Sequence, residues 1–336
     1  MIFQPTSRPP LPLLVTGIAG VAGYNALAYF QKRYPGQVIG VRRHDNWPLS
    51  GTGIEPCNTE SYDELEALFE KYSFAAVLNC GGSCALKSCE LDPFMAKRVN
   101  VQNIETLLGV LEKRPRVRLV HLSIDLVFSG NRSGEYHEDE PTDPVTIYGK
   151  TMVEAENLIL NTRPEAAILR ISLPMGISFN GHAGAIDWIQ SRFQKNKPAT
   201  LYYDEVRTPT YTECMNKVFS QVLSRGELKG LYHAGGKRKL SLYEIAQIVN
   251  VVGGFNPDNL IGCFRVEAGP IPPRAGNVTM QSNRLADDLG YEPFLPWPLD
   301  KRLLPTSQTW HDEMAGKIDG SPELLEKTLY NPAYIV

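Results

Sequence analysis

Three glycines at three-residue intervals form the part of the sequence whose residue types and spacing are best suited to bind an anion. Gly17, Gly20 and Gly23 follow an apolar run that begins at Leu13, and a helix is expected over about 21–34. Because glycine has no side chain, the backbone can approach a pyrophosphate closely, and the free N–H groups of the first helical turn point at it. A merely tight structural turn is the alternative. The spacing predicts a dinucleotide site built from Gly17, Ala19, Gly20 and Val21.

Two arginines stand where the second strand of such a fold ends. Arg42 and Arg43 follow the strand expected over 37–41. A carboxylate at this place normally accepts hydrogen bonds from the ribose of NAD, whereas an arginine accommodates the additional phosphate of NADP. We therefore expect NADP, with NAD as the alternative. Both arginines could instead be solvated surface charges, and Asp45 could still turn back to a ribose.

The elements that must position these residues alternate regularly. Apolar strands are expected at about 37–41, 75–79, 118–123 and 166–170, and the intervening helices at about 62–72, 93–113 and 147–161. This alternation predicts an α/β fold, a doubly wound parallel sheet of Rossmann type with helices on both faces. Beyond residue 170 the alternation breaks. The loops expected at 173–184 and 257–276 are of the kind that covers or forms a ligand site.

Composition excludes several classes of partner. The chain has 336 residues, 43% of them hydrophobic, and a net charge of −3, so nucleic acid is not an expected partner. No apolar run reaches membrane-spanning length and no leader pattern is present, so we expect a cytoplasmic protein with no membrane partner. The six cysteines are expected to be structural thiols. The spacing of Cys80, Cys84 and Cys89 does not favour a metal site.

Further polar residues are candidates outside the glycine turn. Asp125 follows the strand expected to end near Ser123, at the rim where parallel sheets bind ligands. It could act as a base or bind substrate hydroxyls, or it could brace a loop. The acidic run at 135–143 is expected to be a solvated loop, and His182 a surface histidine, with a proton carrier as its alternative.

Several segments, taken in order, resemble a known family. They include the glycine turn, LNCGGSCALKSCELDP, HLSIDLVFSG, IYGK, DEVRTPTYTE and GLYHAGG. These segments resemble the extended short-chain dehydrogenases/reductases, in the dTDP-4-dehydrorhamnose reductase branch, which includes the regulatory beta subunit of methionine adenosyltransferase. The likeness covers about residues 13–298.

The resemblance implies a catalytic role for Tyr148, which would transfer a proton as hydride moves between nicotinamide and substrate. In the family, a lysine four residues later lowers the pKa of the tyrosine, and a threonine or serine binds the substrate oxygen. Here those positions hold Met152 and Ile124. Lys150 lies about 200° around the helix from Tyr148 and should not face the same site. It stays a catalytic candidate only if the helix is distorted.

The resemblance implies further contacts. It places the loop of Cys80, Gly81 and Gly82 against the cofactor and Ser83 against the substrate. Arg207 and Arg274 are the first choices for the pyrophosphate of a nucleotide sugar, with ordinary salt bridges as the alternative.

The leading hypothesis is an NADP-binding reductase-like protein for a nucleotide-linked or similar polyhydroxylated substrate, with atypical chemistry. The alternative is a catalytically silent NADP-binding regulatory or scaffolding subunit, and a redox-neutral isomerase or lyase is a third. A homodimer or a partner enzyme is possible. We expect a dinucleotide-binding core at 1–170 with about 207–235, a smaller discontinuous substrate-side lobe at about 171–206 and 236–300, and a C-terminal extension at 301–336.

Overall fold

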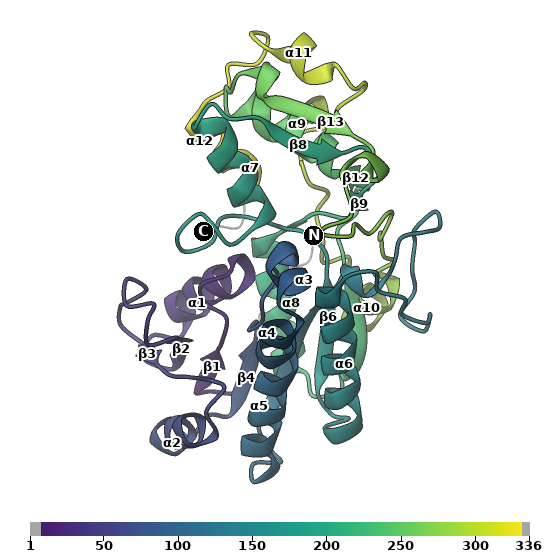
Figure 1. Ribbon diagram of the computed structural model, residues 1–336. Helices are drawn as coiled ribbons and strands as arrows, with labels where there is room; N and C mark the ends of the chain where they lie inside the picture. The colour runs from purple at the N-terminus through teal and green to yellow at the C-terminus, as the bar shows by residue number, and fades with distance from the viewer. Residues whose placement is uncertain (1–7, 331–336) are drawn as a thin grey trace.

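A seven-stranded parallel sheet forms the centre of the larger lobe (Figure 1). The computed structural model describes residues 8–330. The strand order is β11-β6-β5-β4-β1-β2-β3, and every neighbouring pair is parallel. The prediction of a doubly wound parallel sheet is confirmed. The strands are β1 (Leu13–Val15), β2 (Val38–Arg42), β3 (Ile54–Pro56), β4 (Ala76–Asn79), β5 (Arg118–Ile124), β6 (Ala167–Ile171) and β11 (Gly230–Ala234).

Helices cover both faces of this sheet. Along β1, Leu13 and Val15 join one apolar cluster and Leu14 joins another, because successive strand residues point to opposite faces. The first cluster contains Phe30 of α1 and residues of α8; the second contains Leu65 of α2 and residues of α5 and α6. The helices are α1 (Val21–Arg33), α2 (Tyr62–Tyr72), α5 (Asn103–Glu112), α6 (Ile147–Thr162) and α8 (Thr212–Ser224).

The helix expected over 93–113 is interrupted. A π-helical turn, Arg98–Gln102, separates α4 (Pro93–Lys97) from α5, and α3 (Leu86–Leu91) precedes them. The buried Asn100 lies in this turn; it accepts a hydrogen bond from Ser83 N at 2.7 Å and donates one to Thr151 Oγ1 at 2.9 Å. Such turns recur at functional sites. Here the turn connects the loop after β4 with α6.

A smaller lobe lies beyond the carboxyl ends of the main strands (Figure 1). The chain enters it after β6, returns to the main sheet for α8 and β11, and enters it again. The division of the chain into domains stays a prediction. The remaining elements are β7 (Pro174–Met175), β8 (Ala199–Tyr202), β9 (Val206–Arg207), β10 (Thr210–Tyr211), β12 (Leu240–Ser241), β13 (Leu260–Cys263), α7 (Ala185–Gln194), α9 (Leu242–Val252), α10 (Asn283–Leu289), α11 (Trp310–Met314), α12 (Pro322–Leu329) and the 3₁₀ turns Asp125–Val127, Pro257–Asn259, Arg265–Glu267 and Lys301–Leu303.

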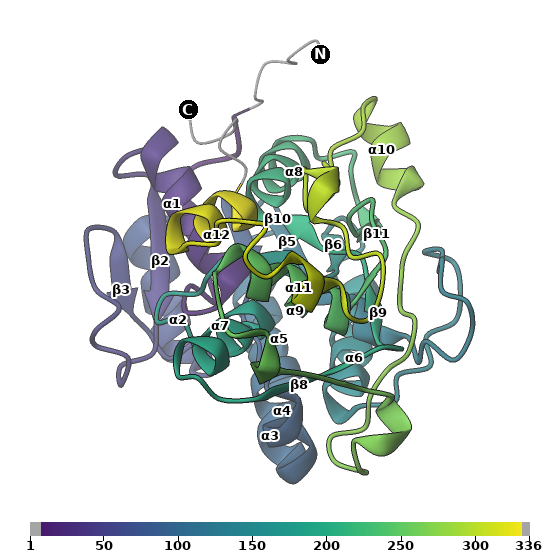
Figure 2. The same ribbon diagram turned by 90° about the horizontal axis from the view of Figure 1, so that it is seen from above.

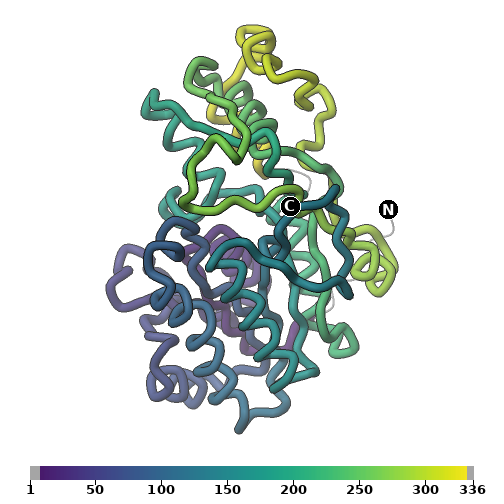
Figure 3. Tube along the Cα trace, turned by 45° about the vertical axis from the view of Figure 1, so that its right-hand side comes forward, coloured from purple at the N-terminus to yellow at the C-terminus, as the bar shows by residue number. Residues whose placement is uncertain are grey.

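Helices α11 and α12 both contact α9; seen from above, α11 lies over α9 and α12 lies to one side (Figure 2), and the trace in Figure 3 shows the same lobe above the rest of the chain. A segment around 264–276 passes between the smaller lobe and the main sheet (Figure 3). No helix within residues 8–330 is long and apolar enough to cross a membrane.

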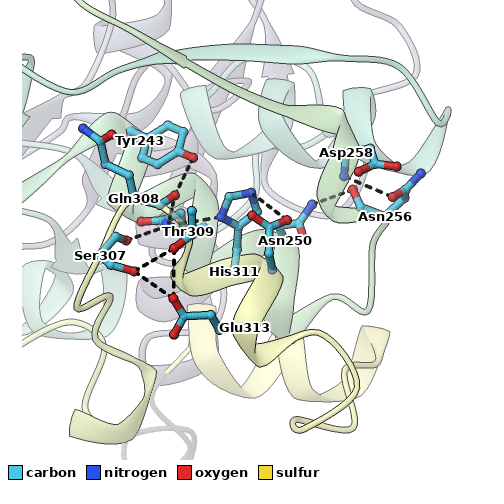
Figure 4. A network of polar contacts seen from close by, with 11 residues as sticks. Tyr243, Asn250, Asn256, Asp258, Ser307, Gln308, Thr309, His311 and Glu313 are labelled. Carbon is cyan, nitrogen blue, oxygen red and sulfur yellow. Dashed lines mark hydrogen bonds and ion pairs between the residues drawn. The ribbon is translucent and has the colours of Figure 1, made fainter.

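Polar contacts attach residues 307–311 to α9 (Figure 4). Gln247 Nε2 donates to the carbonyls of Ser307 and Gln308 and approaches His311 Nδ1, each at 3.1 Å. The Tyr243 hydroxyl donates to the Gln308 carbonyl at 2.9 Å. The residues from 307 to 311 are thus held against the smaller lobe.

Candidate functional site

One cleft of about 980 Å³ runs along the carboxyl edge of the main sheet, between the sheet and the smaller lobe. Its wall includes the glycine turn, the ends of β2, β5 and β6, and residues of α7, β8 and β9. Ligands of open parallel sheets bind at this edge. The structure brings together on this wall all of the predicted cofactor residues, Gly17, Ala19, Gly20, Val21, Arg42, Arg43, Cys80, Gly81, Gly82 and Tyr148.

The glycine turn is in backbone contact with the loop after β4. Gly17 has a φ of +64°, and a Cβ there would lie 2.1 Å from the Cys80 carbonyl oxygen. A Cβ on Gly23 would lie 2.3 Å from the Gly17 carbonyl oxygen. Thr16 Oγ1 accepts a hydrogen bond from Gly81 N at 3.1 Å, which fixes the two loops together. Only glycine fits at positions 17 and 23.

The N-terminus of α1 opens into this cleft without a capping group. Gly20 is its N-cap, and within the described residues no side chain caps the helix and no acidic residue lies in its first turn. The first N–H groups of a helix have no partner inside the helix and carry the positive end of its dipole. The residues present therefore fit the pyrophosphate of a dinucleotide.

The two arginines after β2 differ in their surroundings. Arg42 Nη1 donates to the carbonyls of Arg43 at 2.9 Å and His44 at 3.2 Å, which shapes the loop. Arg43 pairs with Asp45 at 3.1 Å, and the two side chains are 68% and 70% exposed. The hydrogen bond from Arg43 lowers the pKa of Asp45. Such an exposed pair is weak, so a phosphate can take the place of Asp45.

Tyr148 lies on the wall of the cleft, one helical turn before Met152. It is 8% exposed, and Ile124 and Met152 line the cleft with it. Burial raises the pKa of the Tyr148 hydroxyl, Cys84 and Asp125 raise it further, and Arg207 opposes them. Tyr148 is therefore a neutral phenol at physiological pH.

The structure does not bring Lys150 to the site. Helix α6 is continuous from Ile147 to Thr162, so it has no distortion that would turn Lys150 inward. Its side chain is exposed and is not part of the cleft wall. The candidate role of Lys150 in catalysis is wrong for this reason.

Asp125 is a buried residue that holds Arg207 and Ser172 in place. It is fully buried and does not line the cleft. Its carboxylate accepts hydrogen bonds from Arg207 Nε at 2.7 Å, Arg207 Nη2 at 2.5 Å and Ser172 Oγ at 2.5 Å. Because both of its oxygens accept these hydrogen bonds, Asp125 is not placed to act as a base. It has the alternative, structural role.

Arg207 and Arg274 share a buried carboxylate, that of Glu205. Arg207 Nη1 and Arg274 Nη1 lie 3.8 and 3.7 Å from its two oxygens. Burial lowers the pKa of Arg207, but the charges of Asp125 and Glu205 outweigh it and leave that pKa above its usual value. Arg207 is thus engaged by two carboxylates and is not free for a pyrophosphate, contrary to the expectation.

Two predicted positions lie beside the cleft rather than on it. Ser83 is not part of the wall, although Gly82 and Cys84 are, and its backbone N–H donates to Asn100 Oδ1 at 2.7 Å. His182 is exposed, and its backbone N–H donates to Ser178 Oγ at 3.2 Å.

The six thiols are free, and burial raises the pKa of Cys57 to about 11. Within residues 8–330, no three metal-binding side chains are grouped.

The acidic run at 135–143 is a loop in which two carboxylates accept hydrogen bonds from neighbouring elements. Asp143 accepts hydrogen bonds from Ser129 N at 2.7 Å and Ser129 Oγ at 2.6 Å. Glu138 accepts one from His233 N at 2.9 Å. Glu135, Asp139 and Asp143 are exposed and Glu138 and Glu140 are partly exposed, as expected of a solvated loop, and β11 and the turn after β5 donate hydrogen bonds to two of these carboxylates.

Three residues of the site, Glu205, Asn100 and Thr16, were not predicted from the sequence. Glu205 lies in the segment DEVRTPTYTE beside Arg207, so two opposite charges two residues apart were a usable signal. Thr16 and Asn100 carry no such signal, because their contacts join residues far apart in the chain.

Comparison with known proteins assigns the family. The RmlD substrate-binding domain family matches residues 11–297. The chain belongs to this family. The RmlD-type chain is 24% identical over 296 residues to subunit beta of methionine adenosyltransferase 2 from Danio rerio, a match that covers 84% of this chain and 85% of the relative. It is 28% identical over 240 residues to a dTDP-4-dehydrorhamnose reductase from Aggregatibacter actinomycetemcomitans, covering 70% and 76%.

A solved structure shares the fold of this RmlD-type chain. The dTDP-4-dehydrorhamnose reductase from Bacillus anthracis, in complex with NADP, superimposes with a TM-score of 0.70 at 17% identity. The match covers 91% of this chain and 97% of the other. The resemblance inferred from the sequence segments is confirmed.

Proposed function

We propose that this protein binds NADP(H) and a nucleotide-linked sugar in its cleft, and that it is a reductase-type oxidoreductase in which proton transfer is slow. The main support is that one continuous cleft is lined by the glycine turn, by Tyr148 and by the polar residues Glu205 and Arg274. The family, with its dTDP-4-dehydrorhamnose reductases, supports the class of substrate.

The cofactor would be held mainly by backbone groups. The glycine turn and the N-terminus of α1 receive the pyrophosphate, and the Cys80 to Gly82 loop lies alongside. Arg43 takes the additional phosphate of NADP in exchange for Asp45, which favours NADP over NAD. When bound, the cofactor supplies the hydride.

Tyr148 would supply the proton to the substrate oxygen. The phenol is protonated and can donate, but the resulting tyrosinate lies in a buried place without the ammonium that the family has four residues later. Arg207 cannot fully replace that charge, because it is already shared by Asp125 and Glu205. The reaction is therefore slow.

The test is NADPH oxidation with dTDP-4-dehydrorhamnose. We expect weak turnover that is lost in Tyr148→Phe, and a gain of about 100-fold or more when Ile124→Thr and Met152→Lys are combined, since general acid–base groups contribute that much. Met152→Leu with the same Ile124→Thr is the matched control and should gain far less.

The second candidate, a catalytically silent NADP-binding subunit, is favoured by the apolar side chains of Ile124 and Met152 beside Tyr148. The similarity to a methionine adenosyltransferase subunit is in line with it. Tight NADPH binding without turnover, in the wild type and in the doubly restored variant alike, would favour this function over the reductase.

A further inference from the structure

Glu205 and Arg274 form an unusual pair on the wall of the cleft. Glu205 is 2% exposed, and its Oε2 has no hydrogen-bond partner among the described residues. The nearest cation, Arg274 Nη1, is 3.7 Å away, beyond hydrogen-bonding distance. A buried carboxylate oxygen without a hydrogen bond is costly, which indicates that a donor from outside the chain completes it.

Arg274 presents the complementary group. Its Nε is buried and also has no hydrogen-bond partner within residues 8–330. The guanidinium lies 4.7 Å from the centre of the Tyr202 ring, and the Arg274 carbonyl accepts a hydrogen bond from Arg265 Nη1 at 3.0 Å. Arg265 is itself paired with Asp204 at 2.9 Å. Arg274 is therefore fixed in place, with one N–H group free to donate.

The surrounding charges favour a neutral ligand group. Asp125, Arg207, Glu205 and Arg274 alternate in sign and formally cancel. A phosphate at Arg274 would lie against the Glu205 carboxylate, and an ammonium at Glu205 would lie against Arg274; both would add an unbalanced charge in a buried place. A hydroxyl can donate to one residue and accept from the other without adding charge.

We propose that Glu205 and Arg274 form a subsite that binds hydroxyl groups of the ligand's sugar ring. A ring hydroxyl donates to Glu205 Oε2, and the same or the adjacent hydroxyl accepts from Arg274 Nε. This subsite rests on the proposed function, because it names the part of the ligand that the cleft would recognise. Burial raises the pKa of the Glu205 carboxyl, and Arg274 and Arg207 oppose that rise only in part, so a donated hydrogen bond from the ligand would favour its ionised form.

The experiment compares dTDP-glucose with dTDP by calorimetry on NADPH-loaded protein. The two probes differ by the glucosyl group and by the additional charge on the terminal phosphate of dTDP, so the change in the ratio of their dissociation constants between wild type and variant reports on the subsite. We expect dTDP-glucose to bind about 10-fold more tightly than dTDP, as charge-assisted hydrogen bonds predict. Glu205→Gln and Arg274→Gln should each remove most of this ratio while leaving the affinity for dTDP unchanged.

Glu292→Gln is the control, because Glu292 forms a surface ion pair with Lys237 away from the cleft wall. It should keep the full ratio. Melting temperatures check that each variant is folded. If Glu205→Gln does not fold, the ratio measured for Arg274→Gln decides the test.

An unchanged ratio in both folded variants, or equal affinity of the wild type for dTDP-glucose and dTDP, would overturn the subsite while the proposed function stands. NADPH binding without binding of either dTDP compound would overturn the subsite together with the proposed substrate class. If NADPH does not bind, the cofactor assignment fails, and the ratio of the two dTDP compounds measured without cofactor still decides the subsite.

Discussion

At the scale of single residues, Gly23 lies where α1 meets the turn that precedes it. We predict that Gly23→Ala destabilises the protein by about 2 kcal/mol, because the new Cβ would lie 2.3 Å from the Gly17 carbonyl oxygen and backbone would have to shift. Urea unfolding measures the change. In Gly226→Ala, where a Cβ meets no atom within 4 Å, the change should stay below about 0.5 kcal/mol.

Equal stability of the two glycine variants would mean that the turn is not as tightly packed as its geometry indicates. A loss confined to Gly23→Ala would support the contact between the turn and α1.

Residues whose role depends on the backbone were predictable from sequence, whereas charged side chains were not. The spacing of Gly17 and Gly20 was enough to predict the tight turn, and both residues line the cleft. Asp125 and Arg207 looked equally functional in sequence, but they lie 82 residues apart and neutralise each other in the fold. Only the fold, which brings Arg207 of β9 to Asp125 in the turn after β5, could show that.

At the scale of elements, Gln247 of α9 holds the residues that precede α11. We predict that Gln247→Ala costs about 1 kcal/mol, because the carbonyls of Ser307 and Gln308 lose the hydrogen bonds that Nε2 donates. Hydrogen exchange should accelerate in the amides of 307–314. Gln190→Ala is the matched control, since Gln190 Nε2 has no hydrogen-bond partner in the described chain.

If both glutamine variants exchange these amides at the wild-type rate, the buried contacts of Gln247 do not hold the segment. Faster exchange in Gln247→Ala alone is the outcome that the geometry predicts.

Alternation of apolar strands and helices was enough to predict the main elements. The long helix expected over 93–113 was wrong in its middle, because the π-helical turn at Arg98–Gln102 depends on contacts of Asn100 with distant residues. The short strand β3 was missed, because only pairing with β2 defines its three residues. Local pattern cannot show either feature.

At the scale of the whole molecule, two buried histidines make stability depend on pH. Burial lowers the pKa of His121 to about 4, and burial together with Arg170 lowers that of His233 to about 3. The unfolded chain, with histidine pKa values of about 6.5, binds more protons below that pH. Stability is therefore complete above pH 6.5 and falls as pH drops, by about 2 kcal/mol per histidine at pH 5.

Urea unfolding at pH 7.5 and pH 5 measures this loss. Combining His121→Gln with His233→Gln should flatten the dependence, whereas the exposed His182→Gln should leave it as in the wild type. A wild type that is equally stable at both pH values would contradict the burial of the two neutral rings.

Calorimetry with NADPH and NADH shows whether the cleft binds NADP(H). We predict that NADPH binds about 10-fold or more tightly than NADH, because Arg43 contributes a charge-assisted contact with the additional phosphate. Arg43→Ala should remove most of that difference and leave the affinity for NADH unchanged. Absence of binding by either nucleotide would contradict the assignment of the glycine turn, and with it the function proposed for the whole cleft.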